Sequence, residues 1–183
     1  MHILEKKIRD ASAEGRTALI PFVTAGYPSV DAFWNIVGEL DESGADVIEI
    51  GVPFSDPVAD GPVVEGASVI ALENGMTLHK IMEGLLERRG KFRAGLVLMG
   101  YMNPFMQYGL ENLARDAGEA GVHGFIVPDL PFDEAGAMRA VLAAHGMALI
   151  PLVGPNTGTE RMKLYADVSE GYVYAVSVMG TTG

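Results

Sequence analysis

The feature that most constrains the fold of this chain is a regular alternation of short apolar runs with segments of helical periodicity. The apolar runs have the length and composition of buried strands, and they cover residues 17–26, 45–53, 94–102, 123–131, 147–155 and 171–180. Helical spacing is found between and before them, at about 2–14, 29–44, 62–74, 77–89, 107–120, 132–145 and 156–169. Apolar strands that alternate with helices form parallel sheets covered by helices, so the sequence predicts an α/β fold.

Two architectures share this alternation. A doubly wound open sheet usually carries a glycine-rich turn after its first strand, but the corresponding segment TAGYPS (24–29) lacks the G-x-G-x-x-G pattern. A (β/α)8 barrel normally needs about 250 residues, and the sequence stops directly after the sixth apolar run. We therefore expect a single domain over 1–183 that is an incomplete (β/α)8 TIM barrel, with six β/α units after an N-terminal helix.

Two helix starts carry capping signals. Ser29 is the first residue of the helical segment 29–44 and has the side chain of a good N-cap. Thr157 and Glu160 have the spacing of a capping box, so we expect Thr157 to begin the short helix within 156–169.

Charge and composition exclude several classes of partner. The net charge of −11 and the scattered basic residues argue against a nucleic-acid surface. No apolar run approaches the roughly 20 residues that span a bilayer, and the charged first ten residues do not resemble a signal peptide. The chain has no cysteine, which excludes disulfides, and its four histidines are dispersed, so we expect no metal site. We expect a cytoplasmic protein that binds neither nucleic acid nor membranes.

The segment IEIGVPFSDPVADGP (48–62) carries the candidate chemistry. Glu49 lies within an apolar run, where burial would be costly and would raise the pKa of its carboxyl toward neutrality, as proton transfer requires. The alternative is a Glu49 that pairs with Lys or Arg or faces water. Asp60 lies in a loop stiffened by three prolines, and its alternative role is to cap the helix that begins near Pro62.

This segment closely resembles the signature of the tryptophan synthase alpha subunit family. The similarity continues through PFVTAGYP (21–28), MGYMNPF (99–105), VPDLP (127–131) and YAVSVMGTTG (174–183), and thus covers almost the whole chain. The resemblance implies a barrel that cleaves indole-3-glycerol phosphate to indole and glyceraldehyde 3-phosphate by a retro-aldol reaction. It implies that Glu49 is the proton shuttle and that Asp60 hydrogen-bonds the indole N–H.

The resemblance also implies which residues contact the substrate around the two carboxylates, and that the chain binds a partner subunit. Substrate contacts would come from Phe22, Met99, Tyr101, Val127, Asp129, Thr182 and Gly183. A beta subunit would dock on Asp56, Pro57 and Asn103 in an α2β2 heterotetramer. The family implies no cofactor in this chain, with pyridoxal phosphate only in the beta subunit.

The sequence departs from the family in one respect. The loops after strands seven and eight, which supply most phosphate contacts in the family, have no counterpart in the 183 residues. Without that anchor the substrate loses remote binding energy, so we expect impaired lyase activity from this chain alone, with exposed strand edges. Two other functions stay open: a stand-alone indole-glycerol-phosphate lyase, and a non-catalytic allosteric partner of a beta subunit.

Overall fold

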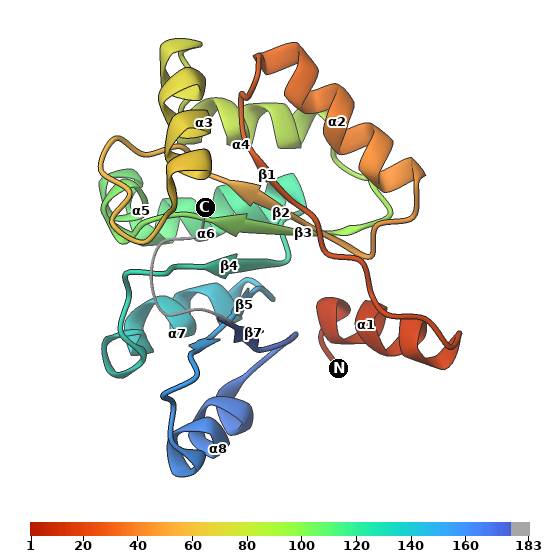
Figure 1. The fold of residues 1–183 in the computed structure, drawn as a ribbon, viewed down its shortest axis with the longest axis vertical. Helices are drawn as coiled ribbons and strands as arrows, with labels where there is room; N and C mark the ends of the chain where they lie inside the picture. Colours follow the sequence, from red (N-terminus) through yellow and green to blue (C-terminus); the bar gives the residue numbers. More distant parts are fainter. Residues whose placement is uncertain (177–183) are drawn as a thin grey trace.

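A computed structural model describes residues 1–176 and shows a curved parallel sheet whose strands follow one another in chain order (Figure 1). The strands of this sheet are β1 (Phe22–Thr24), β2 (Val47–Gly51), β3 (Gly95–Met99), β4 (Gly124–Ile126) and β5 (Ala148–Leu149). A second, two-stranded parallel sheet pairs β6 (Leu152–Val153) with β7 (Tyr174–Ala175). A doubly wound sheet would reverse its strand order at a switch point. The consecutive order therefore confirms the predicted barrel type over the described part of the chain.

Helices connect the strands that follow from separate apolar runs, as the alternation of the sequence predicts, whereas β5 and β6 are joined without a helix. Their bounds are α1 (Ile3–Ala13), α2 (Val30–Glu42), α3 (Pro62–Glu73), α4 (Leu78–Glu87), α5 (Met102–Tyr108), α6 (Leu110–Ala120), the 3-10 turn η1 (Phe132–Glu134), α7 (Gly136–Ala144) and α8 (Thr159–Val168). Ser29 caps α2 as predicted, because its hydroxyl accepts the backbone N–H of Ala32 at 3.2 Å.

The strands are shorter than the apolar runs that predict them, and prolines account for two of the differences. In the first run the carbonyl of Pro21 accepts the N–H of Glu49, but Pro21 has no N–H of its own to extend the ladder. The fifth run is divided into β5 and β6 around Pro151 for the same reason. The sixth run continues into 177–180, which lie outside the described residues.

Two predictions about helices are wrong in detail. The segment 107–120 forms parts of α5 and α6, because Gly109, with a φ of +86°, breaks the helical path. Thr157 does not cap α8: Gly158 is the N-cap, and the Thr157 hydroxyl instead accepts the N–H of Gly154 at 2.9 Å.

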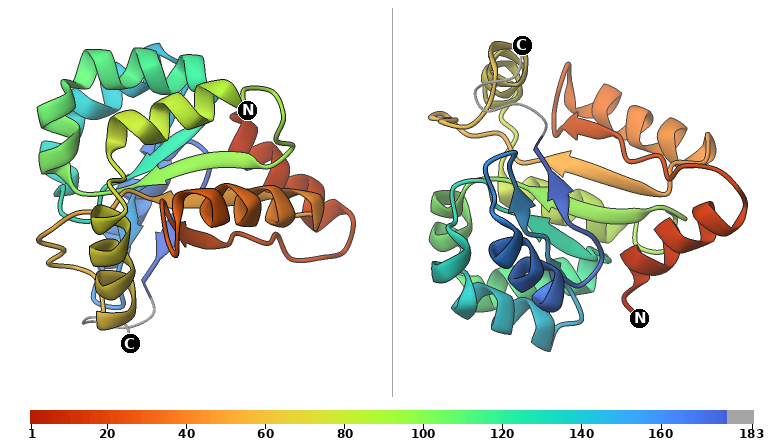
Figure 2. Two further views of the ribbon diagram at one scale, coloured as in Figure 1. Left: turned by 90° about the horizontal axis from the view of Figure 1, so that it is seen from above. Right: turned by 60° about the horizontal axis from the view of Figure 1, so that its bottom comes forward.

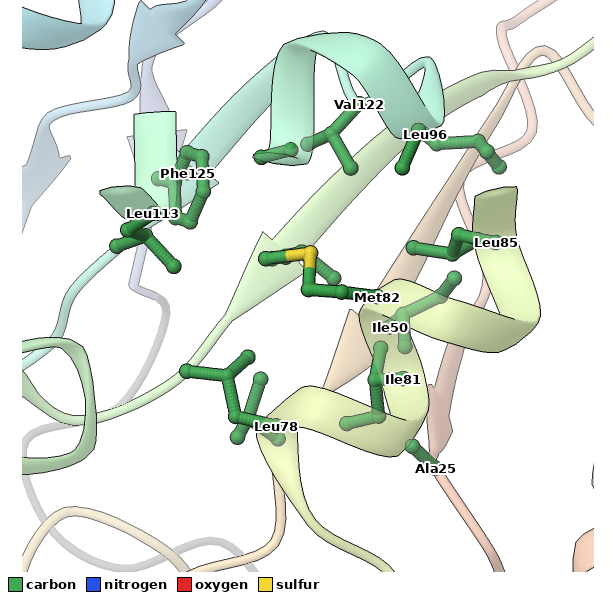
Figure 3. Packing of buried hydrophobic residues seen from close by; sticks show 14 of the residues in the cluster. Ala25, Ile50, Leu78, Ile81, Met82, Leu85, Leu96, Leu113, Val122 and Phe125 are labelled. Carbon is green, nitrogen blue, oxygen red and sulfur yellow. The ribbon is translucent and has the colours of Figure 1, made fainter. Parts of the chain in front are cut away.

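The sheet separates two apolar layers. On its outer face, α4 and α6 pack onto β2 and β3, and Figure 3 shows Ile81, Met82 and Leu85 of α4 close to Ile50 and Leu96. Since side chains alternate along a strand, Ile48 and Ile50 face this outer layer while Val47 and Glu49 face the barrel interior.

The inner layer is small and is closed at one end by α1. Leu4 of α1 packs with inward-facing side chains of the strands, namely Val47, Val97, Ile126, Ala148 and Ile150. Gly95 leaves room for this contact, since a Cβ there would lie 2.5 Å from a methyl group of Leu4. Both panels of Figure 2 show α1 at the amino ends of the strands. The carboxyl ends, with the loop that leads to α3, are left for the site.

Candidate active site

Glu49 is held in the barrel interior at the centre of β2. Its side chain is buried, with 4% of the residue exposed, and the carboxyl oxygen Oε1 accepts a hydrogen bond of 2.7 Å from the hydroxyl of Tyr172. No Lys or Arg among the described residues forms an ion pair with it. Burial raises the pKa of Glu49, and the Tyr172 hydrogen bond opposes the rise by stabilising the carboxylate. The alternative of a salt-bridged or solvent-facing Glu49 is therefore wrong.

An open cleft of about 280 Å³ gives access to Glu49. It is lined by one face of β1, by Glu49 and by the segment that forms β7: Ile20, Phe22, Glu49, Tyr172, Val173, Tyr174 and Ala175. Burial and the nearby Glu49 carboxyl raise the pKa of both tyrosines, so their hydroxyls stay protonated at neutral pH and can donate hydrogen bonds.

Asp60 lies at the carboxyl ends of the strands, in the loop between β2 and α3. It does not cap α3, because Gly61 is the N-cap and the described residues show no side-chain cap hydrogen bond at the start of this helix. Burial raises the pKa of the Asp60 carboxyl, and the nearby Tyr101 hydroxyl opposes the rise. Tyr101 itself is buried, with a pKa raised to about 12, and its oxygen accepts the N–H of Ala59 at 2.9 Å. Tyr101 therefore fixes the backbone next to Asp60.

Phe22 connects the two carboxyl groups. It lines the Glu49 cleft and also the small cavity that contains Asp60 and Met99. Its ring lies against Gly51, the last residue of β2, where a Cβ would be 2.5 Å from the ring. Any larger residue at position 51 would displace the ring. Glu49 and Asp60 thus lie on cavities that share one aromatic wall, at the end of the sheet where barrel enzymes carry their active sites.

The electrostatics of this region suit acid and base catalysis. Two carboxyl groups with raised pKa values lie around one partly exposed aromatic ring, and neither forms an ion pair with another residue in 1–176. Perturbed carboxyls in a cleft are typical of catalytic sites. Among residues 1–176, no group of three or more His, Asp or Glu side chains is arranged to hold a metal ion.

The structure places the other predicted substrate contacts in different positions relative to this centre. Met99 and Tyr101 line the Asp60 cavity. Asp129 is exposed, and its Oδ1 accepts the N–H of Met102 at 2.9 Å, so that it supports the start of α5. Val127 is not brought to the site: it packs with the outer layer, whereas the preceding residue, Ile126, faces the barrel interior. Thr182 and Gly183 lie outside the described residues.

The residues predicted to meet a partner are on the surface beside the site. Asp56 is exposed and accepts a hydrogen bond from the hydroxyl of Ser55, and Pro57 is half-buried. Asn103 is exposed on α5, where its side-chain oxygen accepts a hydrogen bond from Gln107. None of the helices in the described part of the chain is long and apolar enough to cross a membrane.

Comparisons with known proteins show the family of the chain. The family model described as tryptophan synthase alpha chain matches residues 8–183. The tryptophan synthase alpha chain of Desulfovibrio desulfuricans is 64% identical over 183 residues, which is 100% of this chain and 72% of the relative. The chain belongs to the tryptophan synthase alpha chain family.

Solved structures of tryptophan synthase alpha chains share the fold. In a structure of tryptophan synthase from Mycobacterium tuberculosis, one chain superposes with a TM-score of 0.92 at 38% identity, covering 100% of this chain and 70% of that one. The alpha subunit from Legionella pneumophila gives a TM-score of 0.90 at 37% identity, covering 97% and 68%. The family is one of lyases of tryptophan biosynthesis, so the resemblance read from the sequence is confirmed, and the chain spans about 70% of these relatives.

Tyr172 is a residue of the candidate site that reasoning from the sequence missed. It contacts Glu49 across 123 positions of sequence, and nothing in the local pattern around either residue indicates the pairing. The signal available was the pair of tyrosines Tyr172 and Tyr174, two residues apart in a predicted strand, which places both on one face of it.

The hydrogen bond from Tyr172 predicts a measurable change in the titration of Glu49. In a Tyr172→Phe variant the carboxylate loses a donor, so the pKa of Glu49 should rise further above its ordinary value. Because a carboxyl with a raised pKa stabilises the folded state only while it is protonated, the variant should also lose more unfolding free energy as the pH rises through that pKa.

A carbon-13 NMR titration of the Glu49 carboxyl in the 183-residue chain measures this directly. The matched control is Tyr174→Phe, since Tyr174 lines the same cleft but makes no hydrogen bond to Glu49 in the described structure. A midpoint that moves upward equally in both variants, or downward in Tyr172→Phe, would contradict the assigned role of Tyr172.

Proposed function

We propose that this chain carries the indole-3-glycerol phosphate cleavage site of a tryptophan synthase alpha chain, with Glu49 and Asp60 as the catalytic pair. The observation that supports it is the placement of the buried Glu49 carboxyl and the half-buried Asp60 carboxyl, neither in an ion pair among residues 1–176, on cavities that share the Phe22 ring. Family membership supplies the reaction class.

The reaction needs an acid and a base about one aromatic ring apart. The carbon–carbon bond between indole and the glycerol chain breaks when carbon 3 of the indole gains a proton and the neighbouring glycerol hydroxyl loses one. The bonding electrons then return to the indole ring, and the hydroxyl carbon becomes the aldehyde of glyceraldehyde 3-phosphate. Protons are conserved, since one is taken up and one is released. No oxidation or reduction occurs, so two side-chain carboxyls are sufficient.

Glu49 is suited to the proton transfers. Its raised pKa allows the protonated form to persist toward neutral pH, where it can give a proton to the indole carbon, and its carboxylate can then accept the hydroxyl proton. In this role Tyr172 holds the carboxyl in position and moderates its pKa.

Asp60 is suited to the other side of the ring. In the ionised form it can accept a hydrogen bond from the indole N–H and stabilise the positive charge that develops on the ring after protonation. Phe22, Met99 and Tyr101 would form the walls of the indole site, as their cavities indicate. Thr182 and Gly183 stay predictions as further contacts, and Asp129 would act through α5.

We further propose that this chain docks on a beta subunit to form an α2β2 heterotetramer, with pyridoxal phosphate held only by that partner. The surface around Asp56, Pro57 and Asn103 supports a docking role because it also exposes large apolar side chains: Val58 is 79% and Met106 63% exposed. In a titration with a beta subunit, Asp56→Lys should weaken association without changing the chemistry of the isolated chain. Unchanged affinity would count against this surface.

A steady-state assay of indole release tests the proposed reaction. One arm uses the 183-residue chain, and the second uses a chimera that joins residues 1–183 to the part of the Desulfovibrio desulfuricans relative that the match does not cover. We expect slow or undetectable release from the first and steady turnover from the second, because remote phosphate contacts position the substrate. Full turnover by the 183-residue chain would refute the expected dependence on those contacts, and an inactive but folded chimera would refute the proposed site.

A further inference from the structure

A third cavity lies beyond the ends of β4 and β5, and Glu49 is not among its lining residues. It is enclosed by the segment after β4, by η1 and α7, by the chain between β5 and β6, and by α8, which Figure 1 shows on the lower side of the molecule. Its volume is about 180 Å³. Pro128 is the one residue that lines both this cavity and the cavity of Asp60.

Most of the residues that line this cavity have apolar side chains, and polar atoms contribute to its surface as well. The lining includes three prolines, several aliphatic side chains and two aromatic rings, those of Phe132 and Tyr165, whose centroids lie 4.2 Å apart. A dry apolar cavity of about 150 Å³ is large enough to hold benzene, so this cavity has room for a six-membered ring with a small substituent.

Arg139 supplies a charge without a described partner. Its guanidinium lies over the Phe132 ring, 4.8 Å from the centroid, and its Nε is buried without a hydrogen bond. Among residues 1–176, Arg139 forms no ion pair. A buried donor without an acceptor raises the free energy of the protein. A ligand that brings an acceptor into the cavity and accepts the Nε–H of Arg139 would remove this cost.

The nearby polar groups are already engaged and do not compete for Arg139. Asp133 forms an ion pair of 2.7 Å with Arg161, and the Tyr165 hydroxyl accepts a hydrogen bond of 2.9 Å from the same arginine. The acceptor that fits Arg139 is therefore external to these residues. A planar carboxylate can accept two parallel hydrogen bonds from a guanidinium, and an apolar ring attached to it would suit the apolar side chains of this cavity.

We propose that this cavity binds a small monocyclic carboxylate, with the carboxylate on Arg139 and the ring between Phe132, Tyr165 and the prolines. The site is distinct from the Glu49 and Asp60 cavities and does not depend on the proposed lyase reaction. Its contact with the proposed active site is limited to Pro128.

Titration of the 183-residue chain with sodium benzoate, followed by proton–nitrogen NMR, tests the proposal. Benzoate should bind saturably with a dissociation constant in the millimolar range, as expected for a ligand of this size. Shifted amides should lie in 127–132, 135–139, 149–152 and near Tyr165. Benzyl alcohol has the ring without the charge. It should bind at least about tenfold more weakly than benzoate, because a hydrogen bond between two charged groups is lost.

Two variants distinguish the contribution of the Arg139 charge to benzoate binding from the contribution of the cavity volume. Arg139→Met should weaken benzoate binding by about tenfold or more, whereas the matched control Arg89→Met changes an exposed arginine elsewhere and should leave binding unchanged. Leu130→Trp fills the cavity from a half-buried position and should block benzoate while Arg139 stays in place. The proposal is overturned if benzoate shows no saturable shifts, if the shifts map elsewhere, or if folded Arg139→Met and Leu130→Trp variants bind it as well as the parent.

Discussion

Replacement of Glu49 by glutamine should reduce indole release by the chimera by a factor of about 10² to 10⁴, the range that a general acid–base group contributes. Glutamine has nearly the same shape, and its carbonyl oxygen can still accept the hydrogen bond from Tyr172. It cannot give or take a proton at carbon 3 of the indole or at the glycerol hydroxyl. The loss should therefore appear in kcat, with little change in KM.

The control for this variant is Glu42→Gln, which removes an exposed carboxyl at the end of α2. It should leave both kinetic parameters unchanged. Because a neutral residue replaces a buried carboxyl that ionises with difficulty, Glu49→Gln should be at least as stable as the parent at neutral pH in chemical denaturation. A stable Glu49→Gln protein with parental kcat would exclude Glu49 as the proton shuttle.

Asp60→Asn is expected to have the second-largest effect, a loss of about 10² to 10³ in kcat, comparable to the removal of one preorganised electrostatic contact. Asparagine keeps the size of the side chain but cannot balance positive charge on the protonated indole ring. The parent should lose activity as the pH falls through the raised pKa of Asp60, since the protonated form has no charge to offer.

The pH profile distinguishes this role from a structural one. The matched control is Asp167→Asn, an exposed position in the last turn of α8 that is distant in sequence from Asp60. This variant should keep the parental rate and pH profile. If a folded Asp60→Asn variant kept the parental kcat, or if the parental rate did not fall as the pH drops through the raised pKa of Asp60, the assigned contact with the indole N–H would be wrong.

Much of the fold could be predicted from the sequence because apolar runs and helical segments alternate along it. The strand bounds could not, since strand pairing depends on backbone donors, and Pro21 and Pro151 have none. The division of one expected helix into α5 and α6 follows from Gly109, whose positive φ cannot be deduced from composition. The prediction that Thr157 caps α8 is wrong because the Thr157 hydroxyl accepts the N–H of Gly154 in the preceding loop.

The site was predictable to the extent that its residues are local to one motif. Glu49 and Asp60 lie in a single loop-and-strand segment, but the Tyr172 contact joins distant parts of the chain and needs the tertiary fold. Val127 illustrates the sensitivity of strand residues to register. A shift of one position moves a side chain from the barrel interior, where Ile126 lies, to the helix-covered face.

The most direct test of the proposed catalytic pair is a titration of the chimera with indole. The carboxyl carbon-13 resonances of Glu49 and Asp60 are followed together. If one indole molecule lies between these groups, both resonances will shift along the same saturation curve with a single dissociation constant. Shifts at only one carboxyl, or two curves with different constants, would show that the two groups do not share a ligand.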